Sequence, residues 1–322
     1  MKMRQPEKWL RMKGNIMKKH NLSRRRFIKY STMAGVHAAF ASPILASVTD
    51  NAELRAVDTD CDLAVVTGSS PAKNCLKAVD VLGGFSRFVR SGDSVVIKPN
   101  PVGRNRPEQA INTHPEMVRV VVSECIKAGA KTVKVVSHDD SRSFIMNGTA
   151  EAVEQAGGSW HALNEESQYR SVVVPRGTIL RHERIAADIL DADVFINMPI
   201  AKHHAGSTVT LSMKNLMGIN WDRIRFHRTD LHQCIAELAA TVRQSLIIMD
   251  ANHVLLTNGP IGPGEVKAAQ TVIAGVDPVA IDAYVTHLFW QDPAEIRHIR
   301  IAHELGVGEI DFAKLSIREI RV

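Results

Sequence analysis

After residue 62 the chain alternates between short continuous apolar runs and longer segments in which apolar residues recur at helical spacing. Short apolar runs favour buried strands, whereas a period of 3.6 residues favours amphipathic helices. The pattern predicts strands at residues 63–66, 94–98, 131–137, 171–175, 193–198, 245–250 and 315–321. It predicts helices at residues 72–89, 113–128, 149–156, 208–217, 230–243, 278–289 and 294–305.

Local signals mark the ends of the helix at 113–128. Thr113 and Glu116 have the spacing of a capping box, and Pro115 is tolerated in a first turn because backbone donors there lack partners. Gly129 suits the position that follows the helix. We therefore expect Thr113 to cap this helix.

Alternating strands and helices predict an α/β fold with a mostly parallel sheet, or a mixed one, flanked by helices. The strand at 94–98 has no apolar–polar alternation, which fits a strand covered on both faces. The roughly 270 residues after position 49 can bury one large core or two modest ones. We expect one α/β domain over residues 50–322, with a division into two lobes near 158–190 as the alternative.

Polar side chains follow three of the predicted strands. Lys98 and Asn100 follow one strand, Lys202 and His204 lie in a loop after the strand at 193–198, and Asp250 follows the strand at 245–250. Ligands of open α/β sheets bind beyond the carboxyl ends of the strands. These side chains could therefore converge on one rim. Lys202 and His204 would there bind an anion or a metal, or else bond loop carbonyls and each other.

Three further positions combine charge with a buried or helical setting. Lys98 follows a buried strand, so its ammonium must pair with a carboxylate or face a ligand. Lys214 and Asn215 lie in the predicted helix at 208–217, where Lys214 forms a cationic pocket with Lys202 or lies on a solvated face. Asp282 lies inside an apolar helix, which leaves a metal ligand, a general base or the partner of a buried lysine as interpretations.

Several segments together resemble a known family. They are Ile97-Lys98-Pro99-Asn100, Thr113-His114-Pro115-Glu116, Lys202-His203-His204, residues 210–218, residues 277–283 and residues 305–309. In this order they resemble the bacterial and archaeal family called domain of unknown function 362, over nearly all of residues 62–322. Where the family often has Lys-Thr-His, this chain has Lys202-His203-His204, so His204 takes the place of the family histidine. The resemblance implies the site candidates but no reaction.

The N-terminal region carries a different signal. Residues 23–29 read S-R-R-R-F-I-K and resemble the twin-arginine export signal through Arg24, Arg25 and Phe27. The weakly apolar run at 27–48 is too polar for a confident membrane span of about 20 apolar residues. We expect a signal peptide over residues 1–49, with a start at Met17 as an alternative. The expected partner is the twin-arginine translocon, and the expected location is the periplasm, with membrane anchoring if the signal is retained.

Charge and cysteine content exclude two classes of function. Residues 1–49 hold 11 Lys and Arg against one acidic residue, whereas the rest of the chain holds 29 basic and 33 acidic residues. The chain after the signal is thus net negative, which argues against nucleic-acid binding. The four cysteines contain no paired motif, so we expect no cysteine-ligated iron–sulfur cluster.

The leading interpretation is an exported enzyme that handles a small anionic molecule; the sequence does not identify its cofactor, and a divalent metal is one option. Lys98, Asn100, Lys202, Lys214 and Asn215 would hold the anion. Lys202, His204 and Asp282 would take part in catalysis, and the metal ligands would be His204, Asp282 and Asp250. The alternatives are a periplasmic anion- or metal-binding protein without turnover and an accessory subunit of an exported redox complex.

Overall fold

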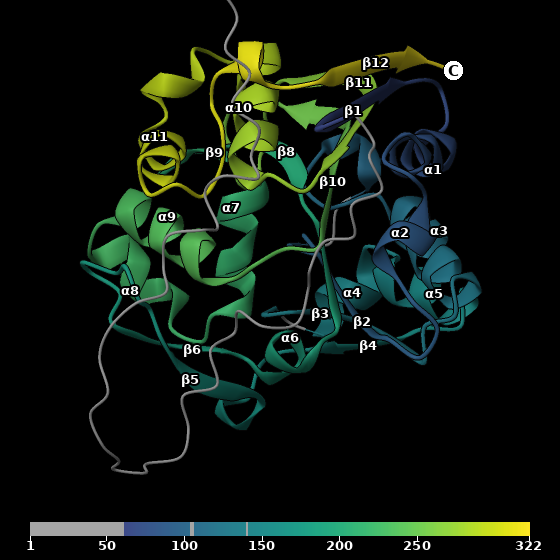
Figure 1. The fold of residues 1–322 in the computed structure, drawn as a ribbon, viewed down its shortest axis with the longest axis horizontal. Helices are drawn as coiled ribbons and strands as arrows, with labels where there is room; N and C mark the ends of the chain where they lie inside the picture. The colour runs from purple at the N-terminus through teal and green to yellow at the C-terminus, as the bar shows by residue number, and fades with distance from the viewer. Residues whose placement is uncertain (1–60, 104–105, 140) are drawn as a thin grey trace, which may run out of the picture. The chain divides into compact units, whose positions relative to one another are not determined.

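The strands form one ten-stranded mixed sheet and a separate antiparallel pair in the part of the chain described by this computed structural model, residues 61–103, 106–139 and 141–322 (Figure 1). The predicted signal peptide and its twin-arginine motif lie outside the described residues. The large sheet contains β1 (Leu63–Thr67), β2 (Ser94–Pro99), β3 (Thr132–Ser137), β4 (Ser159–Ala162), β7 (Val194–Met198), β8 (Ile200–His204), β9 (Thr208–Thr210), β10 (Leu246–Leu255), β11 (Val266–Gly275) and β12 (Ile317–Arg321). The separate pair is β5 (Tyr169–Val173) and β6 (His182–Ala186).

Helices connect most of these strands. They are α1 (Pro71–Val81), α2 (Phe85–Phe88), α3 (Pro115–Lys127), α4 (Ser141–Met146), α5 (Thr149–Gln155), α6 (Ala187–Asp191), α7 (Ser212–Asn215), α8 (Arg223–Arg228), α9 (Leu231–Thr241), α10 (Pro278–Phe289) and α11 (Arg297–Glu304). None of the helices in the described ranges has both the length and the apolar character that crossing a membrane requires.

The large sheet is mostly parallel, as the sequence predicts. Its main path runs β12-β1-β11-β10-β7-β2-β3-β4, with β8 and β9 off this path. β11 is antiparallel to both of its neighbours, and the pairs from β10 through β7, β2 and β3 to β4 are parallel. From β2 the chain continues to β3 on one side, whereas from β7 it continues through β8 and β9 to β10 on the other. The carboxyl ends of β2 and β7 therefore form the switch point at which open α/β sheets bind ligands.

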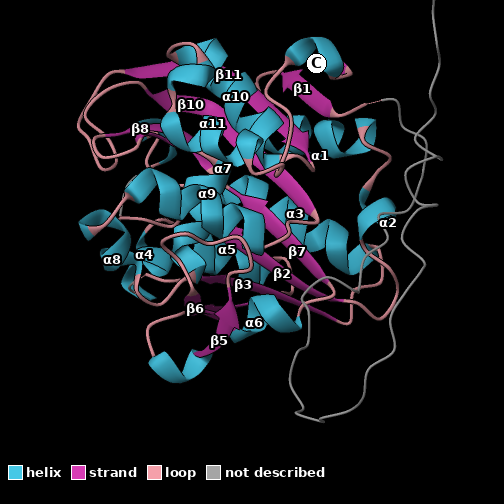
Figure 2. Ribbon diagram, turned by 60° about the vertical axis from the view of Figure 1, so that its left-hand side comes forward, coloured by secondary structure: helices cyan, strands magenta, loops and turns pink. Residues whose placement is uncertain are grey.

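Both faces of the sheet are covered by helices (Figure 2). Val95 and Ile97 of β2 pack into the core formed with α1, α3 and α5. Val96 packs into the opposite core, formed with α7, α9, α10 and α11. Figure 1 shows these two groups of helices on opposite sides of β10. Burial on both faces explains why β2 has no alternation of apolar and polar residues.

Two predicted helices differ from the observed ones. The single helix predicted over 72–89 is wrong, because Gly83 and Gly84 adopt φ values of 102° and 79° and separate α1 from α2. The helix predicted over 208–217 is wrong in its first half, because Thr208–Thr210 pairs with β8 as a strand. The helix itself begins at Ser212.

Details at the strand ends also differ from the prediction. The cap of α3 is His114, whose Nδ1 accepts the Glu116 N–H at 3.2 Å, and not Thr113. The Thr113 hydroxyl instead donates to the Met198 carbonyl, which joins the ends of β2 and β7. Lys202 and His204 belong to β8 rather than to a loop, and Asp250 lies inside β10 rather than at its end.

Candidate functional site

Lys98 lies next to the last residue of β2 and has a buried side chain. The residue is 2% exposed, and its ammonium donates to the Pro99 carbonyl at 2.8 Å and to Asn215 Oδ1 at 3.0 Å. Gly218 lies against this side chain, and a methyl group there would come within 2.8 Å of Lys98 Nζ. Burial is the main cause that lowers the pKa of Lys98 well below its ordinary value.

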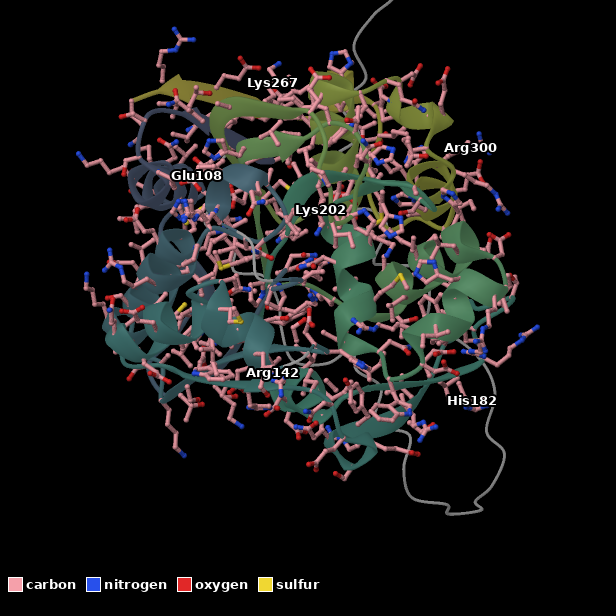
Figure 3. The ribbon with its side chains drawn as sticks, turned by 180° about the vertical axis from the view of Figure 1, so that it is seen from behind. Glu108, Arg142, His182, Lys202, Lys267 and Arg300 are labelled. Atoms are coloured by element: carbon pink, nitrogen blue, oxygen red, sulfur yellow. The ribbon has the colours of Figure 1, made fainter. Side chains whose placement is uncertain are left out.

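Lys202 is the second buried lysine and lies in the interior of the fold (Figure 3). The residue is 1% exposed, and its ammonium donates to the Ile111 carbonyl at 2.7 Å and to Asn100 Oδ1 at 3.1 Å. Burial, followed by the charge of Lys214, lowers the pKa of Lys202 to about 7. Near neutral pH the amine is therefore present in both protonation states.

Asn215 connects the two lysines through side-chain hydrogen bonds. Its Oδ1 accepts from Lys98 and from Asn100 Nδ2 at 2.9 Å, and Asn100 in turn accepts from Lys202. The Asn215 Nδ2 donates to Asn197 Oδ1 at 2.7 Å, which anchors the network to β7. Because these groups are buried and mutually bonded, the network fixes both ammonium groups in position.

Lys214 differs from the other two lysines in having no partner among the residues that the structure describes. It precedes Asn215 in α7 and is partly exposed. No hydrogen bond or ion pair joins its ammonium to another residue within the described ranges. Burial, followed by the charge of Arg223, lowers the pKa of Lys214 to about 8.

Among the described residues that act on these lysines, positive charges outnumber negative ones. Arg223, at the start of α8, lowers the pKa of Lys98 and Lys214, and the charge of Lys214 lowers the pKa of Lys98 and Lys202. The carboxylate of Asp139 acts in the opposite direction on Lys98 and Lys202. We call the group of Lys98, Lys202, Lys214 and Arg223 the lysine site. Because like charges repel strongly where water is excluded, a bound anion would stabilise this site.

Thr210 adds a neutral polar group beside Lys202. It lies directly opposite Lys202 in the antiparallel β8–β9 pair, so both side chains lie on the same face. Thr210 is 4% exposed, and its Oγ1 has no hydrogen-bond partner among the described residues. A buried hydroxyl without a partner is unfavourable, so this group too would gain from a ligand.

Asp282 holds the helix that carries Lys214. The residue before α7 is Leu211, which cannot cap a helix, and both oxygens of Asp282 supply the missing acceptors. Oδ1 accepts the Ser212 N–H at 2.7 Å and Oδ2 accepts the Met213 N–H at 3.0 Å. Burial raises the pKa of Asp282 to about 7. Of the predicted interpretations, the pair with a lysine is wrong, since the partners are backbone amides.

Asp250 plays a similar part at the start of α3. Its Oδ2 accepts the His114 N–H at 2.8 Å, and its Oδ1 accepts from the backbone and side chain of Asn252. Asp250 is 2% exposed. The carboxylate therefore fixes the segment that follows Asn100 and does not reach the lysines through a hydrogen bond.

His204 is held as a neutral imidazole. Its Nδ1 accepts the N–H groups of Gly206 at 3.0 Å and Ser207 at 3.3 Å, so the ring proton is on Nε2. Burial, followed by the charge of Lys214, lowers the pKa of His204 to about 3. The ring stacks on His227 with centroids 5.9 Å apart. His204 thus offers one N–H donor near Lys214.

The predicted metal ligands are not gathered into one site. Within the described residues there is no group of three or more His, Cys, Asp or Glu side chains that could hold a metal ion. The oxygens of Asp282 and Asp250 already accept backbone amides, and Nδ1 of His204 does the same. The donor set of His204, Asp282 and Asp250 therefore does not fit a shared metal.

The structure brings four of the predicted site residues together by hydrogen bonds, namely Lys98, Asn100, Lys202 and Asn215. Lys214 joins them through its charge. Sequence reasoning missed Asn197, Thr210, Arg223 and Asp139. Asn197 ends a predicted strand and could have been found in that way, whereas Arg223 and Asp139 follow no pattern that points to the site.

Asn215 provides the test of the network. Replacing it by Ala removes the acceptor shared by Lys98 and Asn100, so Asn215→Ala should lower the free energy of unfolding by about 3 kcal/mol. The control is Asn164→Ala at an exposed position, which should change it by less than about 0.5 kcal/mol. Denaturant unfolding measures both. Equal stability of the two variants would show that the network does not hold the lysines.

Comparison with known proteins adds a family but no reaction. The chain is 29% identical over 263 residues to the thylakoid-associated protein sll1697 of Synechocystis, which covers 76% of this chain and 79% of the relative. Among solved structures it is similar to the lactate racemase apoprotein from Thermoanaerobacterium thermosaccharolyticum, with a TM-score of 0.46, 11% identity and 77% of this chain covered. A protein from Thermotoga maritima gives a TM-score of 0.38 with 12% identity over 72% of this chain.

The chain spans 58% of the length of each of these two solved structures. A family model described as "Domain of unknown function (DUF362)" matches residues 95–287, which is well over half of the chain and includes the lysine site. The chain therefore belongs to the family of the domain of unknown function 362.

Proposed function

We propose that this protein is an enzyme that acts on a small anionic molecule bound at the lysine site. The observation that carries the proposal is the ammonium of Lys214, which has no partner among the described residues and lies near the charges of Lys98, Lys202 and Arg223. A cluster of buried cations with few carboxylates is unfavourable without a counter-ion. Its place at the switch point of the sheet is where α/β proteins bind ligands.

Each residue of the site has a distinct role in this proposal. Lys214 and Arg223 pair with the acid group of the ligand, because cationic donors form the stronger hydrogen bonds to oxyanions. Lys98 and Lys202 add charge from fixed positions. Lys202 also exchanges a proton with the substrate, since a pKa of about 7 suits an acid–base group at neutral pH. His204 donates its Nε2–H, and Asp282 positions α7.

A binding protein without turnover would use the same residues. The hydrogen bonds that fix Lys98 and Lys202 favour this alternative, because they restrain both groups before any ligand arrives. Incubation with mixtures of phosphorylated and carboxylated metabolites separates the two functions. Conversion of a compound supports the enzyme, and saturable binding without conversion supports the carrier.

We also infer that the protein is exported through the twin-arginine translocon and works in the periplasm. Support comes from the order of a basic stretch, the motif with Arg24, Arg25 and Phe27, and a weakly apolar run. The excess of basic residues before position 50 and the net negative charge after it agree with a separate leader.

Sulfate, which remains a dianion throughout the neutral range, is a suitable first probe of the site. Lys214→Gln removes one charge-assisted contact and should weaken sulfate binding about tenfold or more. The matched control is Lys73→Gln, because Lys73 is exposed and lies outside the lysine site. Isothermal titration calorimetry measures both. The proposal fails if the two variants bind sulfate equally well.

Sulfate binding should be coupled to proton uptake. An anion favours the charged form of each lysine, so it raises the pKa of Lys202 and Lys214 from their values of about 7 and 8. Between pH 7 and 9 the complex therefore holds more protons than the free protein, and affinity should fall as pH rises through this range. Titrations in buffers of different ionisation enthalpy measure the uptake. Sulfate binding without proton uptake at pH 8 would contradict the assignment of Lys202 and Lys214 to the sulfate site.

Export is tested by the double variant Arg24→Lys, Arg25→Lys. Replacing the paired arginines should prevent transport and leave the protein in the cytoplasm, because the motif is what the translocon recognises. The control is Arg4→Lys, Arg11→Lys, which keeps the same charges outside the motif. Cell fractionation and immunoblotting measure the distribution. An unchanged periplasmic amount in the motif variant would overturn this inference.

A further inference from the structure

The three lysines of the site differ in what their amines can reach. Lys98 and Lys202 are 2% and 1% exposed, and each amine donates two hydrogen bonds to oxygen acceptors. Lys214 is partly exposed and has neither a hydrogen bond nor an ion pair to any described residue. Of the three, Lys214 alone thus combines access from solvent with an unused lone pair when it is neutral.

The groups that face Lys214 favour its neutral form. Arg223 on α8 lowers the pKa of Lys214, and the charge of Lys214 in turn lowers the pKa of Lys98 on β2 and of Lys202 on β8. His204 of β8, His227 of α8 and His298 of α11 are close enough for the charge of Lys214 to lower their pKa. Within the described ranges, no carboxylate contributes to the lowered pKa of Lys214.

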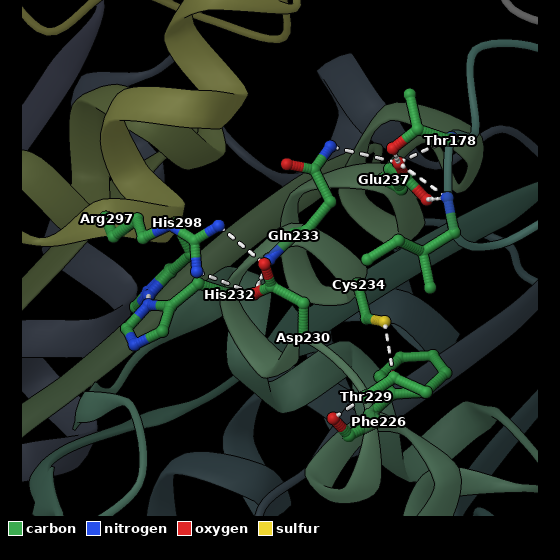
Figure 4. Close-up of polar contacts among 11 residues, drawn as sticks. Thr178, Phe226, Thr229, Asp230, His232, Gln233, Cys234, Glu237, Arg297 and His298 are labelled. Carbon is green, nitrogen blue, oxygen red and sulfur yellow. Dashed lines mark hydrogen bonds and ion pairs between the residues drawn. The ribbon is translucent and has the colours of Figure 1, made fainter.

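Among the described residues, His298 on α11 lies against another imidazole and not against a carboxylate. His298 is fully buried, and its Nδ1 lies 3.2 Å from Nδ1 of His232 on α9 (Figure 4). Burial, followed by His232 and Lys214, lowers the pKa of His298 to about 3. The neighbouring acid Asp230 is engaged by Arg297. Asp230 is therefore already paired with Arg297 and does not act as the counter-ion of Lys214.

The backbone under Lys214 is held firmly. Asp282 bonds the first two amides of α7, and Asn215, the next residue, is tied to Lys98 and Asn197. The Cα of Lys214 therefore lies between two fixed points. A reacting group must be placed accurately relative to its substrate, and supporting hydrogen bonds of this kind provide that placement.

We propose that Lys214 forms an imine with a carbonyl group of the anionic ligand, and that the ligand class is a 2-oxo carboxylate. This inference rests on the proposed anion site, since the carboxylate would be held by Arg223 and the neighbouring lysines. The acid group and the carbonyl of a 2-oxo acid are adjacent, so one short ligand can reach both a cation and the amine.

The chemical step balances without an oxidant or a reductant. The neutral amine of Lys214 attacks the carbonyl carbon, and a proton moves from nitrogen to oxygen to give a carbinolamine. The hydroxyl then takes a proton from a neighbouring ammonium such as Lys202 and leaves as water, while the nitrogen forms the C=N bond. The resulting iminium carries the positive charge that the Lys214 ammonium otherwise carries.

Reductive trapping tests the inference on the whole protein. Glyoxylate is the probe, and sodium cyanoborohydride converts any imine into a stable amine that peptide mass spectrometry locates. At pH 7 Lys214 should be labelled about tenfold or more faster than Lys131, because its pKa of about 8 lies below the ordinary value of a lysine and leaves more of the Lys214 amine neutral. Lys131 is the internal control, since it is exposed and distant in the chain from the site.

Two further readouts separate this inference from the proposed function. Saturating sulfate should slow the labelling of Lys214 about tenfold and leave Lys131 unchanged, because the acid group of glyoxylate competes with sulfate for one site. If sulfate binds but Lys214 is labelled no faster than Lys131, the imine is refuted and the anion site stands. If sulfate does not bind at all, the proposed function itself falls, and the inference with it.

Discussion

The hydrogen bond from buried Lys98 to Asn215 is the interaction on which the site depends. It ties the end of β2 to the short helix α7, and the same oxygen of Asn215 also accepts from Asn100, which holds Lys202. The position of Lys214 follows, because it is the residue next to Asn215. Asp282 secures the other end of the helix through two backbone amides. A cluster of like charges is thereby built at the switch point between β2 and β7, and within the part of the chain that the structure describes the ammonium of Lys214 has no partner.

The apolar pattern predicted the strands that are buried on both faces, and it failed where a buried strand carries polar residues. Residues 95–97 and 194–196 are continuous apolar runs, and the strands predicted around them at 94–98 and 193–198 are confirmed. β11 was missed because its first five residues, 266–270, are mostly exposed and mixed in character. β8 was missed because Lys202, His203 and His204 look like a polar loop, although pairing with β9 and β10 makes them a strand.

The sequence predicts some residues of the candidate site and not others, and the physical reason differs from residue to residue. Lys98 and Asn100 were found because they end a strand that the sequence reveals. The need of Asp282 for a partner was also clear, but its partners are amides 69 and 70 residues away, which no local pattern encodes. Arg223 and Asp139 act on the lysines only through the folded arrangement of α8 and the end of β3. The balance of charges in a site depends on the tertiary structure and is not encoded in a local sequence pattern.

The most direct test of the account is a crystal structure of the mature protein with selenate, whose selenium is located by anomalous scattering. We predict selenate within hydrogen-bond distance of Lys214 Nζ and the Arg223 guanidinium, on the face of the β8–β9 pair that carries Lys202 and Thr210. A structure in which Lys214 pairs with a carboxylate of the protein, with selenate bound only elsewhere, would contradict the central claim that this cluster is an anion site.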